Sequence, residues 1–164
     1  MAKTTIRYWL DEAGIDYAIH KVEQYKREFL EKVDKLVKTL VQHGKEVASI
    51  QIAELDAVYS GELLGSLEGF FFPASHVGII KAYSDYAIYV EFGTGVVGSE
   101  SPHPNPNGYI YDVNNHGDKG WVYYDKNSDT FKWTKGFKSR PFMYNTARQL
   151  EKECKKIAVE VFGK

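Results

Sequence analysis

The chain has very little cysteine and almost no excess of charge, and each scarcity excludes a class of protein. Its 164 residues include one cysteine, Cys154, so no disulfide can form within the chain. The 21 basic and 22 acidic residues leave a formal net charge of −1, whereas nucleic-acid-binding domains usually carry a clear basic excess or patch. We therefore expect neither a disulfide-stabilised scaffold nor a protein that binds nucleic acid sequence-specifically.

Long apolar runs and metal-ligand spacings are also missing. No segment approaches the roughly 18 apolar residues that a membrane-spanning helix needs, and the opening MAKTTIRYWLDEAG lacks the apolar core of a secretory signal. The five histidines never form a His-Glu-x-x-His spacing, and the cysteine has no Cys-x-x-Cys partner. We expect no membrane partner, no zinc site and no bound cofactor.

What is present predicts an N-terminal arm over residues 1–14 and a single α+β domain over 15–164. Apolar residues at helical spacing predict a helix over 16–44, with Asp16 as its N-cap and Gly44 at its end. Further helices are expected over 46–58 and 139–162, the last with Pro141 in its first turn. The first helix is long enough for its apolar stripe to pair with another helix; the stripe comprises Ile19, Val22, Phe29, Val33, Leu36 and Leu40.

Four β-rich runs predict two hairpins. Residues 67–72 and 76–83 flank a turn at 73–75, and residues 121–124 and 131–134 flank a polar turn. Alternation places Trp121 and Tyr123 on one face of their strand, and Phe131 and Trp133 on one face of theirs. Residues 85–92 fit either a strand or a short helix capped by Asp85, and we favour the helix. The predicted architecture is a small antiparallel sheet packed against two main helices.

A long segment over 96–120 is rich in Pro, Gly, Asn and Asp and reads as a loop that is functional or mobile. Just before it, Gly93, Gly95 and Gly98 spell G-x-G-x-x-G after an apolar run. A dinucleotide site needs a helix to open at the third glycine, and the prolines at 102, 104 and 106 prevent a regular helix there. The glycines therefore predict a sharp chain reversal with unusual backbone angles.

Three candidate functions for single residues remain open. Glu91 and His103 would form an acid–base pair of a small hydrolase if they were close. The preferred interpretation makes Glu91 structural, accepting hydrogen bonds from N–H groups of the glycine turn or pairing with Arg140. Cys154 lies on the apolar stripe of the final helix, which indicates a buried structural thiol. Several aromatic residues would stack on sugars, or else fill a core or an interface: Trp121, Tyr123, Tyr124 and Trp133.

The order of four segments resembles a phage protein family. These are S-G-E-L-L-G-S-L (60–67), Y-A-I-Y-V-E-F-G-T-G (86–95), G-W-V-Y-Y (120–124) and R-P-F-M-Y-N-T-A (140–147). Together they resemble the "gene-product-ten-like" tail-component family of long-tailed bacteriophages and prophages. The positions that carry the resemblance are Tyr86, Tyr89, Glu91, Phe92, Gly93, Thr94, Gly95, Trp121, Arg140, Pro141 and Phe142.

The resemblance implies a structural protein of the head–tail neck rather than an enzyme. Relatives in this region join or complete the tail and form rings, often of six copies, around the DNA channel. The implied partners are other copies of the chain and the neighbouring connector and tail-tube proteins. The implied location is the host cytoplasm during assembly and the virion afterwards. The alternative is a glycan- or cell-wall-binding module that uses exposed aromatic residues.

Overall fold

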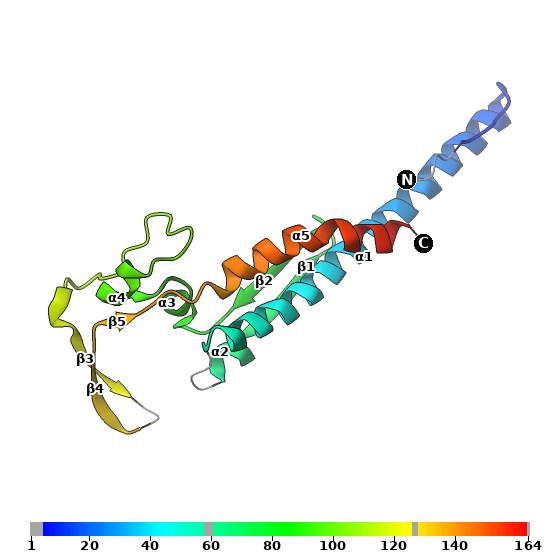
Figure 1. Ribbon diagram of the computed structural model, residues 1–164. Coiled ribbons are helices and arrows are strands. Elements are labelled where there is room, and N and C mark those ends of the chain that lie inside the picture. The colour runs from blue at the N-terminus through cyan, green and yellow to red at the C-terminus, as the bar shows by residue number, and fades with distance from the viewer. Residues whose placement is uncertain (1–4, 58–60, 126–127, 164) are drawn as a thin grey trace.

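The computed structural model describes residues 5–57, 61–125 and 128–163, which form an elongated α+β fold (Figure 1). The predicted fold class is confirmed, but two separate two-stranded antiparallel sheets replace the single sheet that we expected. The elements in chain order are α1 (Glu12–Glu54), α2 (Glu62–Gly65), β1 (Leu67–Phe72), β2 (Val77–Ala82), α3 (Ala87–Phe92), α4 (Gly95–Glu100), the 3-10 turn η1 (Gly117–Lys119), β3 (Trp121–Asp125), β4 (Thr130–Thr134), β5 (Gly136–Phe137) and α5 (Phe142–Phe162).

One helix of 43 residues replaces the last part of the predicted arm and the first two predicted helices. It begins at Glu12 because the side chain of Asp11 accepts a hydrogen bond of 2.7 Å from the N–H of Gly14. The prediction of Asp16 as N-cap is therefore wrong, and the arm ends earlier than residue 14. At 1.5 Å per residue, α1 is about 65 Å long.

Gly44 lies inside α1 and does not end it. A Cβ atom at this position would lie 2.3 Å from Cδ1 of Ile80 and 2.8 Å from Cδ1 of Leu150. The glycine therefore serves the close approach of β2 and α5 to α1, and interpreting it as a helix stop was wrong. The helix ends at Glu54, with Leu55 as its C-cap; the end predicted at residue 58 lies outside the described residues.

Helix α5 runs antiparallel beside α1 (Figure 1). Near its start, Asn145 donates a 2.9 Å hydrogen bond to Gln51, and at its end the rings of Phe162 and Phe29 lie 5.6 Å apart. The part of α1 that precedes Phe29 extends beyond α5 for about 25 Å. Pro141 is the N-cap of α5 rather than a residue of its first turn.

The β1–β2 hairpin packs one face on the middle of α1. Its inner face includes Gly69 and Gly78, where a Cβ would meet the side chain of Val41. The turn is held near α1 by a 2.5 Å contact between His76 and Asp34. The first strand has the predicted limits, and the second is one residue shorter at each end than predicted.

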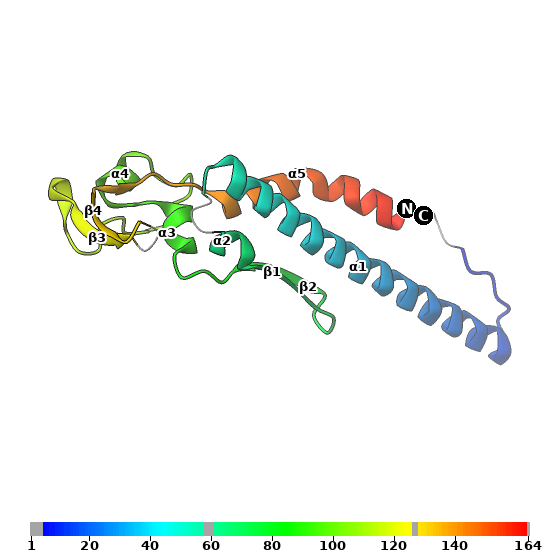
Figure 2. The same ribbon diagram turned by 90° about the horizontal axis from the view of Figure 1, so that it is seen from below.

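The remaining small elements lie at the end of the molecule opposite the projection of α1 (Figure 2). Residues 87–92 form a helix, as we favoured, although Tyr86 rather than Asp85 occupies the N-cap. The segment 96–120 is not a loop throughout, because α4 and η1 lie at its two ends. None of the described helices contains a stretch long and apolar enough to cross a bilayer.

The hydrophobic core lies where the C-terminal end of α1 meets α2, α3 and the start of α5. Its buried members come from segments far apart in the chain, so this junction fixes the position of α3 against α5. They are Ala48, Ile52, Ala57, Leu63, Leu67, Ala87, Val90 and Phe142.

Candidate functional site

The carboxylate of Glu91, near the end of α3, caps the start of α5. Its Oε2 accepts a 2.8 Å hydrogen bond from the N–H of Met143, and its Oε1 accepts one of 2.9 Å from the N–H of Tyr144. These N–H groups belong to the first turn of α5, where no helical carbonyl is available to them and the helix dipole favours an anion. Glu91 therefore accepts backbone hydrogen bonds as expected, but from α5 rather than from the glycine turn.

His103 completes this junction from the segment after α4. Its Nε2 lies 3.0 Å from Oε1 of Glu91, and the two side chains are only 5% and 11% exposed. Its Nδ1 lies within hydrogen-bond distance of the backbone of Asn105. The proximity that an acid–base pair requires is thus present. Both carboxylate oxygens, however, are already engaged by backbone donors.

Aromatic rings enclose His103. Its ring centroid lies 4.4 Å from that of Phe92 and 5.3 Å from that of Tyr144. The ring of Tyr109 stacks on the ring of Phe92, with the two ring centroids 4.6 Å apart. The hydroxyl of Tyr111 accepts a 3.1 Å hydrogen bond from the N–H of His103. The central part of the 96–120 segment is therefore anchored on α3.

Burial raises the pKa of Tyr109, and the neighbouring hydroxyls of Tyr89 and Tyr111 raise it further. The phenol therefore stays neutral throughout the physiological range. Sequence reasoning missed Tyr109 and Tyr111 altogether. The one signal for them was the pair of tyrosines in the Y-I-Y run, within a segment otherwise made of turn residues.

The glycine turn has the predicted unusual backbone angles at two of its three glycines. Gly93 and Gly95 have φ angles of 84° and 62°, whereas Gly98 lies within α4 and has no positive φ. A Cβ on Gly93 would lie 2.7 Å from the backbone nitrogen of Ser139 and 2.8 Å from the carbonyl oxygen of Phe137. The turn is thus pressed against the chain that leads into α5.

Short β-bridges and one hydroxyl reinforce this contact. Thr94 pairs with Phe137, and Gly95 pairs with Gly136, in antiparallel bridges. The hydroxyl of Ser139 donates a 2.6 Å hydrogen bond to the carbonyl oxygen of Glu91. The segment 91–95 and the segment 136–144 therefore form one continuous structural unit.

Arg140 does not form an ion pair with Glu91, so the second alternative that the sequence offered for this carboxylate is wrong. Its backbone N–H donates a 2.9 Å hydrogen bond to the carbonyl of Val90, and its guanidinium lies over the ring of Phe137. Its Nε is buried without a hydrogen-bond partner. Phe142, two residues further on, is a core residue that is 1% exposed.

The other predicted motif residues take three different positions. The hydroxyl of Tyr86 accepts a 3.0 Å hydrogen bond from the N–H of Leu63 at the edge of the core. Trp121 is half-buried, with its ring 4.8 Å from that of His116. Tyr89 is exposed and lies outside the capping arrangement. Cys154, expected to be buried, is only half-buried on α5.

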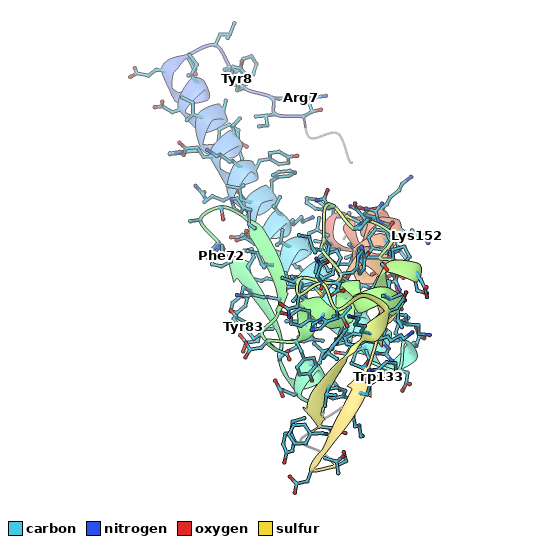
Figure 3. The ribbon with its side chains drawn as sticks, turned by 90° about the vertical axis from the view of Figure 1, so that its left-hand side faces the viewer. Arg7, Tyr8, Phe72, Tyr83, Trp133 and Lys152 are labelled. Atoms are coloured by element: carbon cyan, nitrogen blue, oxygen red, sulfur yellow. The ribbon has the colours of Figure 1, made fainter. Side chains whose placement is uncertain are left out.

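The β3–β4 hairpin exposes one apolar face. Its register places Val122 opposite Trp133 and Tyr124 opposite Phe131 on the same face. Phe131 is 75% exposed and Trp133 is 58% exposed, and Figure 3 shows Trp133 on this projecting hairpin. Trp121 lies next to Val122 in β3. Because successive residues of a strand point to opposite faces, Trp121 points away from the face that carries Trp133.

No protein-family model, curated protein or solved structure matches this chain. Within residues 5–57, 61–125 and 128–163, no group of three His, Cys, Asp or Glu side chains is placed to hold a metal ion. The arrangement around Glu91 is therefore described by its geometry alone: a buried carboxylate that holds together α3, the segment after α4, and the start of α5.

Proposed function

We propose that this chain is a non-enzymatic structural protein of the bacteriophage head–tail neck, which assembles as a ring around the DNA channel. The motifs that resemble the tail-component family support this, because Glu91 of the 86–95 motif caps the helix that the 140–147 motif opens. Because this contact joins two parts of the fold, a relative that shares both motifs would share the fold rather than a catalytic reaction.

The observation that carries the proposal is the presence of apolar surfaces at both ends of the subunit. The projecting part of α1 leaves Ile15, Ile19 and Val22 about half exposed, and the β3–β4 hairpin exposes Phe131 and Trp133. Large apolar patches on a soluble chain usually mark contacts with other molecules. An elongated subunit with such patches at opposite ends suits a part that is enclosed by neighbours on several sides.

The chemistry of Glu91 also favours a structural role over hydrolysis. A general acid or base needs a free oxygen aimed at substrate. Here each oxygen of Glu91 accepts a backbone hydrogen bond, and His103 occupies the remaining approach to Oε1. The near-neutral charge is compatible with DNA that slides past, because tight phosphate contacts would slow its passage.

The glycan-binding alternative has weaker support. A sugar groove built from the two hairpin tryptophans would require Trp121 and Trp133 on one face, and the strand register places them on opposite faces. Trp133 instead shares its exposed face with Phe131, Tyr124 and Val122.

The proposal is tested on particles. Antibodies raised against the purified chain should label purified virions of its phage at one place, the junction of head and tail. Native mass spectrometry of the neck released from those particles should show a closed ring of one copy number. Labelling scattered over the capsid, or absence of the chain from the particles, would refute a neck role.

A further inference from the structure

We propose that the projecting part of α1 packs on the outer face of the β1–β2 hairpin of a second copy of this chain, head to tail. This rests on the proposed function, since it names the contact between neighbouring subunits of the ring. Two separate surfaces, a helix stripe and a sheet face, provide the two sides of the contact.

The helix side is an unpartnered continuation of the stripe that α5 covers further along α1. Beyond the Phe29–Phe162 contact, the stripe continues through Val22, Ile19 and Ile15, each about half exposed. Because α5 ends at Phe162, the described part of this chain places no helix over them. Figure 1 shows this part of α1 extending past the end of α5.

The sheet side is the face of β1–β2 that points away from α1. The inner face meets α1 through Gly69 and Gly78. Alternation therefore places Phe70, Phe72, Val77 and Ile79 on the outer face, where the register pairs them across the strands. Figure 3 shows Phe72 on this hairpin, and its side chain is 46% exposed.

The two surfaces match in length. From Glu68 to Phe72 the hairpin face is about 13 Å long, and from Lys26 to Ile19 the helix stripe is about 10 Å long. A helix laid along the hairpin therefore covers the whole apolar face. The inner face of the same hairpin already packs against α1 of its own chain.

Each surface also carries a charged side chain without a salt bridge in the described chain. Lys26 lies on the apolar stripe, between Val22 and Phe29. Glu68 lies at one end of the apolar hairpin face, opposite Lys81, whose Nζ lies over the ring of Tyr83. Neither side chain forms a salt bridge within the subunit. Opposite charges at the ends of matched apolar surfaces fix the direction and register of docking.

The apolar area of the hairpin face indicates how strong a single contact between two copies is. Phe72, Val77 and Ile79 are about half exposed and Phe70 is less exposed. Together they leave on the order of 300 Å² on the hairpin face, which is less than half of the roughly 800 Å² per partner of a standard interface. A single contact is therefore weak, and it becomes stable when a closed ring repeats it. Since the two surfaces differ, repetition of the contact generates a ring or a filament rather than a two-fold dimer.

Cysteine crosslinking in the free protein tests the contact directly. All variants carry Cys154→Ala, so that only the introduced thiols react. Protein with Val22→Cys mixed with protein with Ile79→Cys at high concentration should form a disulfide-linked heterodimer, whereas neither should crosslink alone. Lys35→Cys, on the opposite side of α1, replaces Val22→Cys as the matched control and should not crosslink. Crosslinking of Val22→Cys with itself, or no crosslink in the mixture, would overturn the proposal.

A charge exchange provides the second test. Lys26→Glu should weaken self-association by at least about tenfold, measured by sedimentation, because two acids would then face each other. Glu68→Lys combined with Lys26→Glu should restore it, whereas Lys35→Glu should have no effect. Failure of the double variant to recover would count against the Lys26–Glu68 pairing. These measurements use the free protein, so a chain absent from virions would refute the neck role without changing their outcome.

Discussion

The Nε2 atom of His103 lies 3.0 Å from the carboxylate of Glu91, and both side chains are almost completely buried. The same carboxylate caps α5 through two backbone hydrogen bonds. One side chain thus joins three segments: α3, the segment after α4, and the start of α5.

Replacing Glu91 should destabilise the fold rather than abolish a reaction. Glu91→Ala leaves two partly buried N–H groups and the buried His103 without their acceptor, at a cost of roughly 2–4 kcal/mol in the free energy of unfolding. Glu91→Gln keeps one acceptor oxygen and should cost less. Thermal and urea unfolding measure both changes. If both variants melt at or above the parent temperature, Glu91 does not stabilise this junction.

The anchor of the 96–120 segment should depend on Tyr111. Tyr111→Phe removes the acceptor of the His103 N–H and should cost about 1 kcal/mol. Amide exchange should become faster around His103 while remaining unchanged in α1. Tyr89→Phe, which alters an exposed hydroxyl of the same region, is the control. Equal exchange in parent and Tyr111→Phe proteins would mean that the ring contacts alone hold the segment.

The close packing at Gly44 makes a prediction opposite to helix propensity. Gly44→Ala should favour the helix by up to about 1 kcal/mol, but its methyl group would collide with Ile80 and Leu150, and overpacking costs about 1–3 kcal/mol. We expect net destabilisation. Gly65→Ala has open space around its Cβ and should be neutral or stabilising. A higher melting temperature for Gly44→Ala would show that α5 and β2 move apart easily.

Acid stability should depend on Glu153. Its hydrogen bond from His43, and then one from Gln149, hold its pKa below the ordinary value of 4.5. A carboxyl with a lowered pKa stabilises the fold above its unfolded-state pKa, and this contribution is lost as the pH falls through the native value. Melting temperatures between pH 7 and pH 3 should therefore fall less steeply for Glu153→Gln than for the parent. Glu160→Gln, on the same helix, should retain the parent slope.

Periodicity predicted the elements well where one physical signal dominated. The β1 strand, the two hairpins and the final helix follow from alternation and from an apolar stripe, and their limits differ from the observed ones by a few residues. Gly44 was misread because a glycine that ends a helix and a glycine that permits close packing look the same in sequence. Only the positions of Ile80 and Leu150 distinguish them.

The site was predicted in its central residue but not in its partners. An acidic residue in an apolar run indicated that Glu91 accepts hydrogen bonds, yet its donors lie 52 and 53 positions away. Arg140 was a plausible partner by charge, but the chain passes Val90 in a direction that turns its side chain toward Phe137. Such choices depend on tertiary packing, which no local pattern records.

The distance in sequence between Glu91 and its donors has a consequence for synthesis. During translation the nascent chain exposes Glu91 well before α5 emerges, so α1 and the β1–β2 hairpin can form while the carboxylate still faces water. The junction closes only after residues 142–144 are made, and contacts between such distant segments form slowly. A nascent chain that stops before Phe142 therefore has a central carboxylate with no helix to cap.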